Sequence, residues 1–540
     1  AVDEQPRVRH QPLVLLLTPL LLAALFPAAA APAAPAPADG AGLRAGQPAA
    51  REAPARADTL EEAVTGPEEL RRRLRRILRE PSLTRAHVGL VVQVAETGRI
   101  LFERAPHRRF VPASNTKIVT GAVALHQLGA DHRWETRLVA TGPIRDGTLR
   151  GDLWVVGGGD PLLGRDDLGA LADRLQQAGV RRVSGDLVGD GRRYPGPQWG
   201  SGWMWTDVYT GWGAGISALR LDPGRIRASL LPGPAMGDSA RLVLRAGGPL
   251  PTIRNRARTG PPGSDVRLDF VPDPRFEPPA LEGWIPADAD SVDLYLAPDH
   301  PTTHVVEALA DSLAGEDVRI AGEVRRARRG EEPSGVAWTD TLRSDSLGAV
   351  LPELLKPSDN QIAEMLVRAL GVEEDDRGTA EAGLDVVEDQ LQEWGIEAGA
   401  IDLNDGSGMS RYNQVTPAAV TRLLRRLWQL PDYDLFRDAL PVAADDGTLE
   451  GRLLGTPAAN NLLGKTGSLS SVRALSGYVR AGDGTTLVYS LLLNGYDGSG
   501  DVAIAMEDLM VEQLSLYRRP VAPGWPGERP PEEDDGGDGG

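Results

Sequence analysis

The sequence contains no cysteine among its 540 residues. This absence excludes disulfide bonds, cysteine-based zinc sites and a lipid anchor on an N-terminal cysteine. A basic surplus is also missing, because the formal net charge is −18. The acidic balance argues against nucleic acid and anionic membrane surfaces as main partners. Beyond the N-terminal segment no run is apolar enough to span a bilayer, which needs roughly 20 residues.

Two weak motifs do not develop into a cofactor or metal site. The glycine-rich stretch Val155–Pro161 lacks the third glycine of a dinucleotide fingerprint, so we interpret it as a tight turn. His300 and His304 have four-residue spacing, but Pro301 separates them and no carboxylate motif follows. We therefore expect neither a cofactor nor a metal.

Residues 1–38 have the pattern of a secretory signal followed by a low-complexity Ala/Pro run. A basic start with Arg7 and Arg9 precedes the mostly apolar stretch Leu13–Phe26, and small residues at Ala28–Ala31 suit cleavage. The competing interpretation is an uncleaved N-terminal anchor. The signal predicts export across the inner membrane to a periplasmic or cell-wall-facing site, with only peripheral or signal-mediated membrane contact.

The rest of the chain is organised around Val111–Thr120, where Ser114 and Lys117 stand three residues apart at the predicted start of a helix. Residues at i and i+3 share one helix face, so the hydroxyl and the amine can meet. A desolvated, neutral lysine can remove the proton that makes a serine hydroxyl nucleophilic. Taken alone, the same spacing also fits a helix cap followed by an exposed lysine.

Hydrophobic patterning predicts a mixed α/β (α+β) fold. A hairpin turns at Glu96–Arg99, and an Asx-Gly type turn at Ala481–Gly484 joins two late strands. Four tryptophans between 199 and 212 indicate either packing between layers or a groove wall. Helices are expected at 60–79, 114–128, 167–177, 301–313, 344–355, 360–370, 380–394, 416–428 and 502–517, a strand at 182–190, and short strands at 219–287.

Two further motifs favour the interpretation of Ser114 and Lys117 as a catalytic pair over a helix cap. Ser358-Asp359-Asn360 opens a helix, and Lys465-Thr466-Gly467 opens the late pair of strands. Ser-x-x-Lys, Ser-x-Asn and Lys-Thr-Gly in this order form the signature set of the penicillin-binding and β-lactamase superfamily of active-site serine acyltransferases. Asp359 is expected to be a structural cap.

The chain resembles the class C low-molecular-mass penicillin-binding proteins, the D-alanyl-D-alanine carboxypeptidase/endopeptidase type, over about residues 60 to 517. The long interval from Ser114 to Ser358 separates it from β-lactamases. Asp405–Arg411 resembles the Asp-Gly-Ser-Gly-Leu-Ser-Arg signature of that group, with Met409 in place of leucine. Stretches Gly151–Pro161 and 216–219 resemble its inserted domains.

The resemblance implies acyl transfer through a covalent serine ester. Ser114 would attack the penultimate D-alanine carbonyl of a peptidoglycan stem peptide, with Lys117 as base. Burial and a second cation, Lys465, would lower the pKa of Lys117. Ser358 would relay a proton to the leaving nitrogen, and Asn360 would hold the peptide amide.

The remaining site residues also follow from the resemblance. Lys465 and Thr466 would bind the terminal carboxylate, and the backbone N–H groups of Ser114 and Ser468 would hold the oxyanion. Gly467 would let the substrate lie close to the strand as an added strand. Asp207 and Arg411 would approach the substrate side chain, although either could be an ordinary surface charge.

Architecture follows from the long interval between the first two motifs. Residues 60–134 and 336–517 are expected to form a transpeptidase-like domain, an antiparallel sheet between helices. Residues 135–335 are expected to form one or two inserted, mostly β domains, and 518–540 a disordered acidic tail.

Expected partners are stem peptides and cross-links of peptidoglycan, with β-lactams as covalent inhibitors. The resemblance does not separate carboxypeptidase from endopeptidase. The alternatives are a β-lactamase and a catalytically idle wall-binding protein on the same fold.

Overall fold

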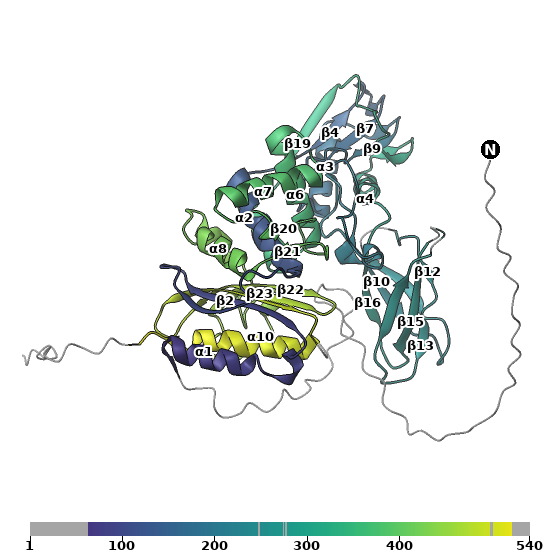
Figure 1. The fold of residues 1–540 in the computed structure, drawn as a ribbon. Coiled ribbons are helices and arrows are strands. Elements are labelled where there is room, and N and C mark those ends of the chain that lie inside the picture. The colour runs from purple at the N-terminus through teal and green to yellow at the C-terminus, as the bar shows by residue number, and fades with distance from the viewer. Residues whose placement is uncertain (1–62, 247–248, 274, 276–277, 497–499, 521–540) are drawn as a thin grey trace, which may run out of the picture. The chain divides into compact units, whose positions relative to one another are not determined.

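The computed structural model of the protein describes residues 63–520, apart from 247–248, 274, 276–277 and 497–499 (Figure 1). The predicted signal segment and the stretch from 521 to 540 lie outside the described residues. No helix in the described part combines the length and apolar character needed to cross a bilayer.

A five-stranded antiparallel sheet joins the two ends of the described chain, in the order β22-β23-β24-β2-β3. The early strand β2 pairs with the late strand β24 over its whole length, from His87 opposite Asn494 to Val94 opposite Leu487. Both predicted hairpins are confirmed, and β22 lies at an edge of the sheet. The strands are β2 (His87–Val94), β3 (Ile100–Arg104), β22 (Leu462–Leu469), β23 (Val472–Arg480) and β24 (Thr486–Asn494).

Helices cover both faces of this sheet (Figure 1). One face packs against α1 and α10, where Leu70 and Leu74 are fully buried, as their four-residue spacing predicts. The other face packs against the layer that contains α2, α6 and α8. The helices are α1 (Gly66–Ile77), α2 (Thr116–Leu128), α5 (Leu347–Leu355), α6 (Asn360–Asp375), α7 (Ala380–Glu393), α8 (Pro417–Leu427), α9 (Tyr433–Asp438) and α10 (Gly500–Ser515).

The prediction that a disordered tail begins at residue 518 is wrong at its first residue. Arg518 belongs to β25 (Tyr517–Arg518), which pairs in parallel with β1 (Val64–Thr65). The reason is that the Tyr517 side chain is completely buried, which keeps the backbone against β1. Other short elements are β20 (Ile401–Asp402), β21 (Gln414–Val415), η1 (Pro81–Leu83), η2 (Ala113–Asn115), η3 (Asp207–Tyr209), η4 (Gly211–Gly213) and η5 (Gly447–Leu449).

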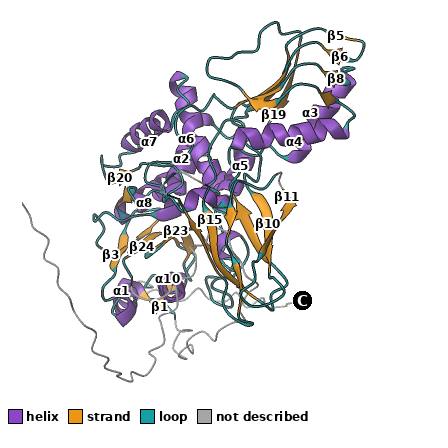
Figure 2. Cartoon of the chain, turned by 90° about the vertical axis from the view of Figure 1, so that its right-hand side faces the viewer, coloured by secondary structure: helices purple, strands orange, loops and turns teal. Residues whose placement is uncertain are grey.

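The inserted segment begins with a layered α/β part rather than a mostly β one. Its sheet has the order β18-β9-β7-β4-β19, with β7 parallel to β9, and α3 and α4 pack together on it (Figure 2). The elements are β4 (Glu135–Ala140), β7 (Leu153–Val156), α3 (Arg165–Gln177), β9 (Leu187–Asp190), α4 (Pro301–Gly315), β18 (Val324–Arg326) and β19 (Trp338–Arg343).

Two predictions for this part need correction. Strand β19 pairs with β4 from Trp338 to Arg343, so these residues belong to the inserted sheet and not to the segment predicted from 336. The single strand expected at 182–190 is two strands in different sheets, because the chain turns at Ser184–Asp186. The second, four-stranded sheet contains β5 (Ile144–Arg145), β6 (Thr148–Leu149), β8 (Arg182–Val183) and β17 (Arg319–Ile320).

The middle of the insert is built from strands, as the short strand-like runs at 219–287 predict. Two small sheets enclose a core that includes Leu230, Leu281 and Leu294. The strands are β10 (Ile226–Leu231), β11 (Arg241–Ala246), β12 (Arg254–Asn255), β13 (Arg258–Gly260), β14 (Arg267–Val271), β15 (Ala280–Pro286) and β16 (Val292–Leu296).

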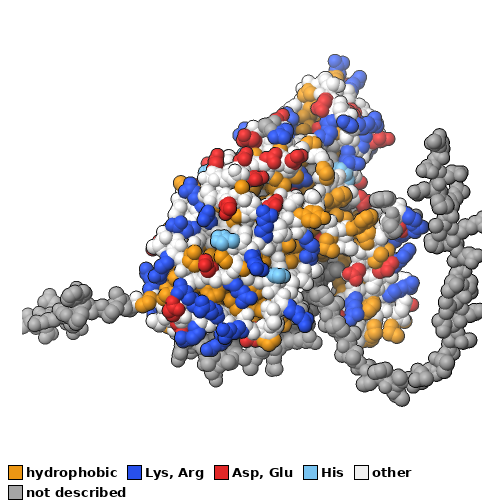
Figure 3. All heavy atoms as spheres, in the orientation of Figure 1, with side chains coloured by type: hydrophobic (Ala, Val, Ile, Leu, Met, Phe, Trp, Pro, Cys, Tyr) orange, Lys and Arg blue, Asp and Glu red, His pale blue; other side chains and the backbone are white. Residues whose placement is uncertain are grey.

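On the face of the molecule drawn in Figure 3, charged side chains of both signs are mixed with apolar ones.

Candidate active site

Ser114 and Lys117 meet at the junction of η2 and α2, as their spacing predicts. The Lys117 Nζ atom donates a hydrogen bond to Ser114 Oγ at 3.0 Å. Asn115 does not cap the helix, since its Nδ2 atom donates instead to the backbone oxygen of Lys465 at 2.7 Å. This bond holds the serine turn against β22, so the first and third motifs come together.

The Lys117 amine is completely buried. Besides Ser114, it donates to Asn360 Oδ1 and to the backbone oxygen of Ser407, each at 2.7 Å. Burial lowers the pKa of Lys117 from 10.5 to about 8, and the carboxylates of Asp405, Asp359 and Glu364 oppose that change. About a tenth of this amine is therefore neutral at pH 7 and can accept a proton.

Lys465 is the second buried amine, and its Nζ atom donates to the backbone oxygen of Thr466 at 3.0 Å. Burial, followed by the charge of Lys117, lowers the pKa of Lys465 well below its usual value. The expectation was that Lys465 would act on Lys117. Burial is instead the main cause of the lowered pKa of Lys117. The repulsion between the two amines contributes to the lowered pKa of Lys465.

The second motif lies at the start of α6. Asp359 is confirmed as a cap, because its Oδ1 atom accepts a hydrogen bond from the Ile362 N–H at 2.8 Å. The amide of Asn360 binds Lys117 through its oxygen and donates to the Trp212 backbone oxygen at 3.0 Å through its nitrogen. Ser358 lies beside the cleft in a left-handed conformation with φ 65°, and no contact between its hydroxyl and Lys117 is found among the described residues.

Gly467 was expected to let the substrate approach β22, but in the structure it lets the turn that carries Ser114 approach this strand. A Cβ atom at this position would lie 2.7 Å from the Pro112 oxygen and 3.1 Å from the Ser114 nitrogen. The absent side chain thus makes room for the serine turn itself. Thr466 donates to the Thr448 hydroxyl at 2.6 Å, and the Ser468 hydroxyl accepts from Arg473.

A cleft of about 510 Å³ brings together six of the site residues predicted from the sequence. Within it, burial raises the pKa of Asp207, and the charge of Arg411 opposes this. Arg411 also donates to the Ser470 oxygen at 3.0 Å. The predicted site residues lining this cleft are Ser114, Asp207, Ser358, Asn360, Arg411 and Ser468, whereas Lys117 and Lys465 are buried behind it.

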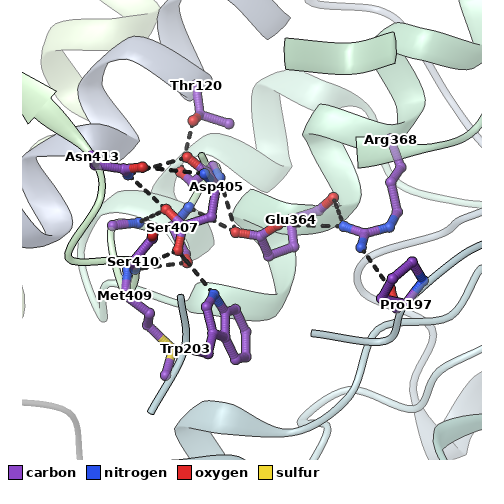
Figure 4. A network of polar contacts seen from close by, with 12 residues as sticks. Thr120, Pro197, Trp203, Glu364, Arg368, Asp405, Ser407, Met409, Ser410 and Asn413 are labelled. Atoms are coloured by element: carbon purple, nitrogen blue, oxygen red, sulfur yellow. Dashed lines mark hydrogen bonds and ion pairs between the residues drawn. The ribbon is translucent and has the colours of Figure 1, made fainter. Parts of the chain in front are cut away.

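Sequence reasoning assigned no role to two buried carboxylates, Glu364 and Asp405, which lie in one polar network (Figure 4). Glu364 Oε1 accepts hydrogen bonds from the N–H groups of Gly406 and Ser407, each at 2.9 Å. Asp405 accepts from the N–H groups of Gly408 and Ser410 at 2.8 and 2.6 Å. One signal was available, because Glu364 and Arg368 are charged residues at i,i+4 spacing within the otherwise apolar stretch 362–370 of α6.

No cluster of metal-ligating side chains occurs within residues 63–520 outside the gaps noted above. His300, one of the two histidines weighed in the sequence, accepts the Thr302 N–H at 3.2 Å through its Nδ1 atom. It therefore caps α4, which accounts for its position beside Pro301.

Comparison with known proteins gives consistent matches. The model of the D-Ala-D-Ala carboxypeptidase 3 (S13) family matches residues 70–515. The D-alanyl-D-alanine carboxypeptidase of Actinomadura sp. (strain R39) is 36% identical over 472 residues, which cover 84% of this chain and 86% of that protein.

Solved structures agree with the sequence comparison. The crystal structure of penicillin binding protein 4 from Haemophilus influenzae is similar with a TM-score of 0.73 and 25% identity, covering 82% of this chain and 99% of that one. A complex of the same Haemophilus protein with a β-lactam gives a TM-score of 0.67 at 25% identity, with coverage of 82% and 98%. These similarities confirm the fold class and the family predicted from the three motifs, the long interval between the first two and the Asp405–Arg411 stretch.

Proposed function

The chain belongs to the D-Ala-D-Ala carboxypeptidase 3 (S13) family, and on that premise we propose that it hydrolyses the D-alanyl-D-alanine bond of peptidoglycan stem peptides through an ester on Ser114. The observation that carries the proposal is the hydrogen bond from the buried Lys117 amine to Ser114 Oγ at 3.0 Å. An amine with a lowered pKa beside a serine hydroxyl is the arrangement that nucleophilic catalysis requires.

In the acylation step, neutral Lys117 removes the proton from Ser114 Oγ as the oxygen attacks the penultimate D-alanine carbonyl. The backbone N–H groups of Ser114 and Ser468 stabilise the negative charge that develops on the carbonyl oxygen. The carbon–nitrogen bond then breaks, and the proton passes from Lys117 through Ser358 to the leaving D-alanine nitrogen. Water hydrolyses the ester in the second step, with Lys117 again acting as base.

Substrate binding uses β22, the edge strand of the sheet that carries Lys465, Thr466 and Gly467. The peptide lies antiparallel or parallel to this edge as an added strand, and Asn360 holds its amide. The terminal carboxylate binds Lys465 and Thr466, beside Gly467. Asp207 and Arg411 contact the side chain of the stem residue that precedes the D-alanines.

β-Lactams resemble the D-alanyl-D-alanine end and would form a persistent ester with Ser114. Support comes from the Haemophilus relative, which has been crystallised with a β-lactam. The N-terminal segment supports export to the periplasmic or cell-wall-facing side, where the polymer is found. Together these points favour a cell-wall hydrolase over a β-lactamase, whose ester would turn over quickly.

The test combines two assays on the purified protein. A fluorescent penicillin should label the wild type for many minutes and should fail to label Ser114→Ala. Stem pentapeptide and cross-linked muropeptides, analysed by mass spectrometry, should lose D-alanine or be cut at the cross-link. Labelling that survives in Ser114→Ala would overturn the nucleophile, and release of the label within seconds would indicate a β-lactamase.

A further inference from the structure

The inserted segment contacts the machinery behind the active site at two points (Figure 4). The indole Nε1 of Trp203 donates to Asp405 Oδ2 at 2.9 Å. Arg368 bridges the second point, with Nη2 donating to the Pro197 backbone oxygen at 3.1 Å and Nη1 lying 3.3 Å from Glu364 Oε2. Both contacts end on the two buried carboxylates, and Trp203 itself does not line the catalytic cleft.

These carboxylates hold the loop at residues 405–410, which we call the lysine-anchoring loop. Its Ser407 backbone oxygen accepts the hydrogen bond from Lys117 Nζ at 2.7 Å. On the other side of the same residue, Glu364 accepts the Ser407 N–H, while Asp405 accepts from the Ser407 hydroxyl at 3.2 Å. Because Glu364, Asp405 and Ser407 are all fully buried, water cannot replace these bonds.

We propose that Trp203 and Glu364 are positioning residues for catalysis, and that through them the inserted segment holds the Ser407 carbonyl where it orients the Lys117 amine toward Ser114. This inference rests on the proposed role of Lys117 as base. It gives the insert a task that neither the motifs nor the family match assign. Without the insert the loop would keep Glu364 but lose the indole donor to Asp405 and the carbonyl that holds Arg368.

The pKa of Lys117 distinguishes a positioning role of Trp203 and Glu364 from a role in stabilising the fold alone. The charged groups that act on the pKa of Lys117 are the carboxylates of Asp405, Asp359 and Glu364, which favour its protonated form. The second buried amine, Lys465, has its own pKa lowered by the charge of Lys117. The Trp203 N–H offsets part of the Asp405 charge, so its removal should raise the pKa of Lys117. Removal of the Glu364 charge should lower that pKa.

The experiment measures the rate of acylation of the full-length protein by a penicillin between pH 6 and pH 9. Trp203→Phe keeps an aromatic ring at this position but deletes the N–H donor, and we expect the rate at pH 7 to fall by about tenfold. The midpoint on the acidic side of its profile should move to higher pH. Glu364→Gln should move the midpoint to lower pH. Reversible binding of the penicillin before acylation should stay within a factor of two of wild type for both.

Trp205→Phe is the matched control. It removes the same N–H from a neighbouring tryptophan that donates to the Tyr209 hydroxyl at 3.1 Å, away from Asp405. Its rate and profile should equal those of wild type. The inference is overturned if Trp203→Phe behaves as Trp205→Phe does, or if both tested variants lose rate with no movement of the midpoint. Labelling of Ser114 in the wild type reports separately on the proposed function.

Discussion

The backbone nitrogen of Ser114 lies 3.1 Å from the point where Gly467 would carry a Cβ atom. The two residues belong to different motifs and different elements, η2 and β22, and the Asn115 bond to Lys465 fixes them together. In the proposed mechanism the backbone N–H groups on either side of this contact, those of Ser114 and Ser468, point toward one oxyanion. The glycine therefore sets the spacing between the two donors.

Gly467→Ala should push the serine turn away from β22. Removal of one oxyanion donor typically costs about 10²–10³ in rate, and we expect a loss of about that size in acylation by penicillin. Overpacking should also lower the free energy of unfolding by about 1–3 kcal/mol. Stopped-flow acylation and thermal melting measure the two effects. Gly169→Ala, in α3 with open space around the site, is the control and should leave acylation unchanged.

The pKa of Lys117 predicts how the rate depends on pH. Burial lowers this pKa to about 8, and only the neutral amine can take the serine proton. Acylation by penicillin should therefore increase from pH 6 to pH 9 with a midpoint near 8. A rate that stays flat over this range, after subtraction of the spontaneous hydrolysis of the penicillin, would contradict Lys117 as the base.

Asp207 should select the side chain of the stem residue. Its carboxylate and the Arg411 guanidinium both face the cleft, so a side chain with an amino group can pair with Asp207. For Asp207→Asn we expect kcat/KM to fall about tenfold on a peptide with such an amino group, and to change little on the peptide with a neutral side chain. An equal decrease in kcat/KM on the two peptides would show that Asp207 does not discriminate between their side chains.

Glu507, on α10 beneath the sheet, should make stability depend on pH. It lies 3.0 Å from Arg452, and burial raises its pKa from 4.5 to about 7. Between pH 4.5 and pH 7 the unfolded chain binds fewer protons at this residue than the folded chain does. The contribution of Glu507 to the free energy of unfolding therefore decreases as pH increases. Glu507→Gln should flatten that slope, so that its stability relative to wild type increases by about 2 kcal/mol between pH 5 and pH 8.

Chemical denaturation at pH 5 and pH 8 would measure the effect of Glu507→Gln. The exposed Glu450→Gln serves as a control for loss of one negative charge and should keep the wild-type slope. If the two variants have the same pH dependence, burial of Glu507 does not have the effect predicted here.

Local patterns in the sequence account for much of the fold. Leu70 and Leu74 repeat at four residues and are buried where that spacing places them. The turns at Glu96–Arg99 and Ala481–Gly484 lie between paired strands, as predicted. These predictions succeed because a helix face or a hairpin depends on neighbours within a few residues. The split of 182–190 into two strands was missed, since its partners are far away in sequence.

The sequence by itself determined which chemical groups the site has, because Ser-x-x-Lys places a hydroxyl and an amine on one face of one helix turn. It also indicated the family, since three short motifs in a fixed order identify the superfamily, and the long interval between the first two, together with the Asp405–Arg411 stretch, separates this group within it. Only the tertiary structure decided the state of those groups. The burial that lowers the pKa of Lys117, the carboxylates of Glu364 and Asp405 behind it, and the indole of Trp203 come from distant segments. A proton's affinity depends on everything packed within a few ångströms, and no local pattern specifies that environment.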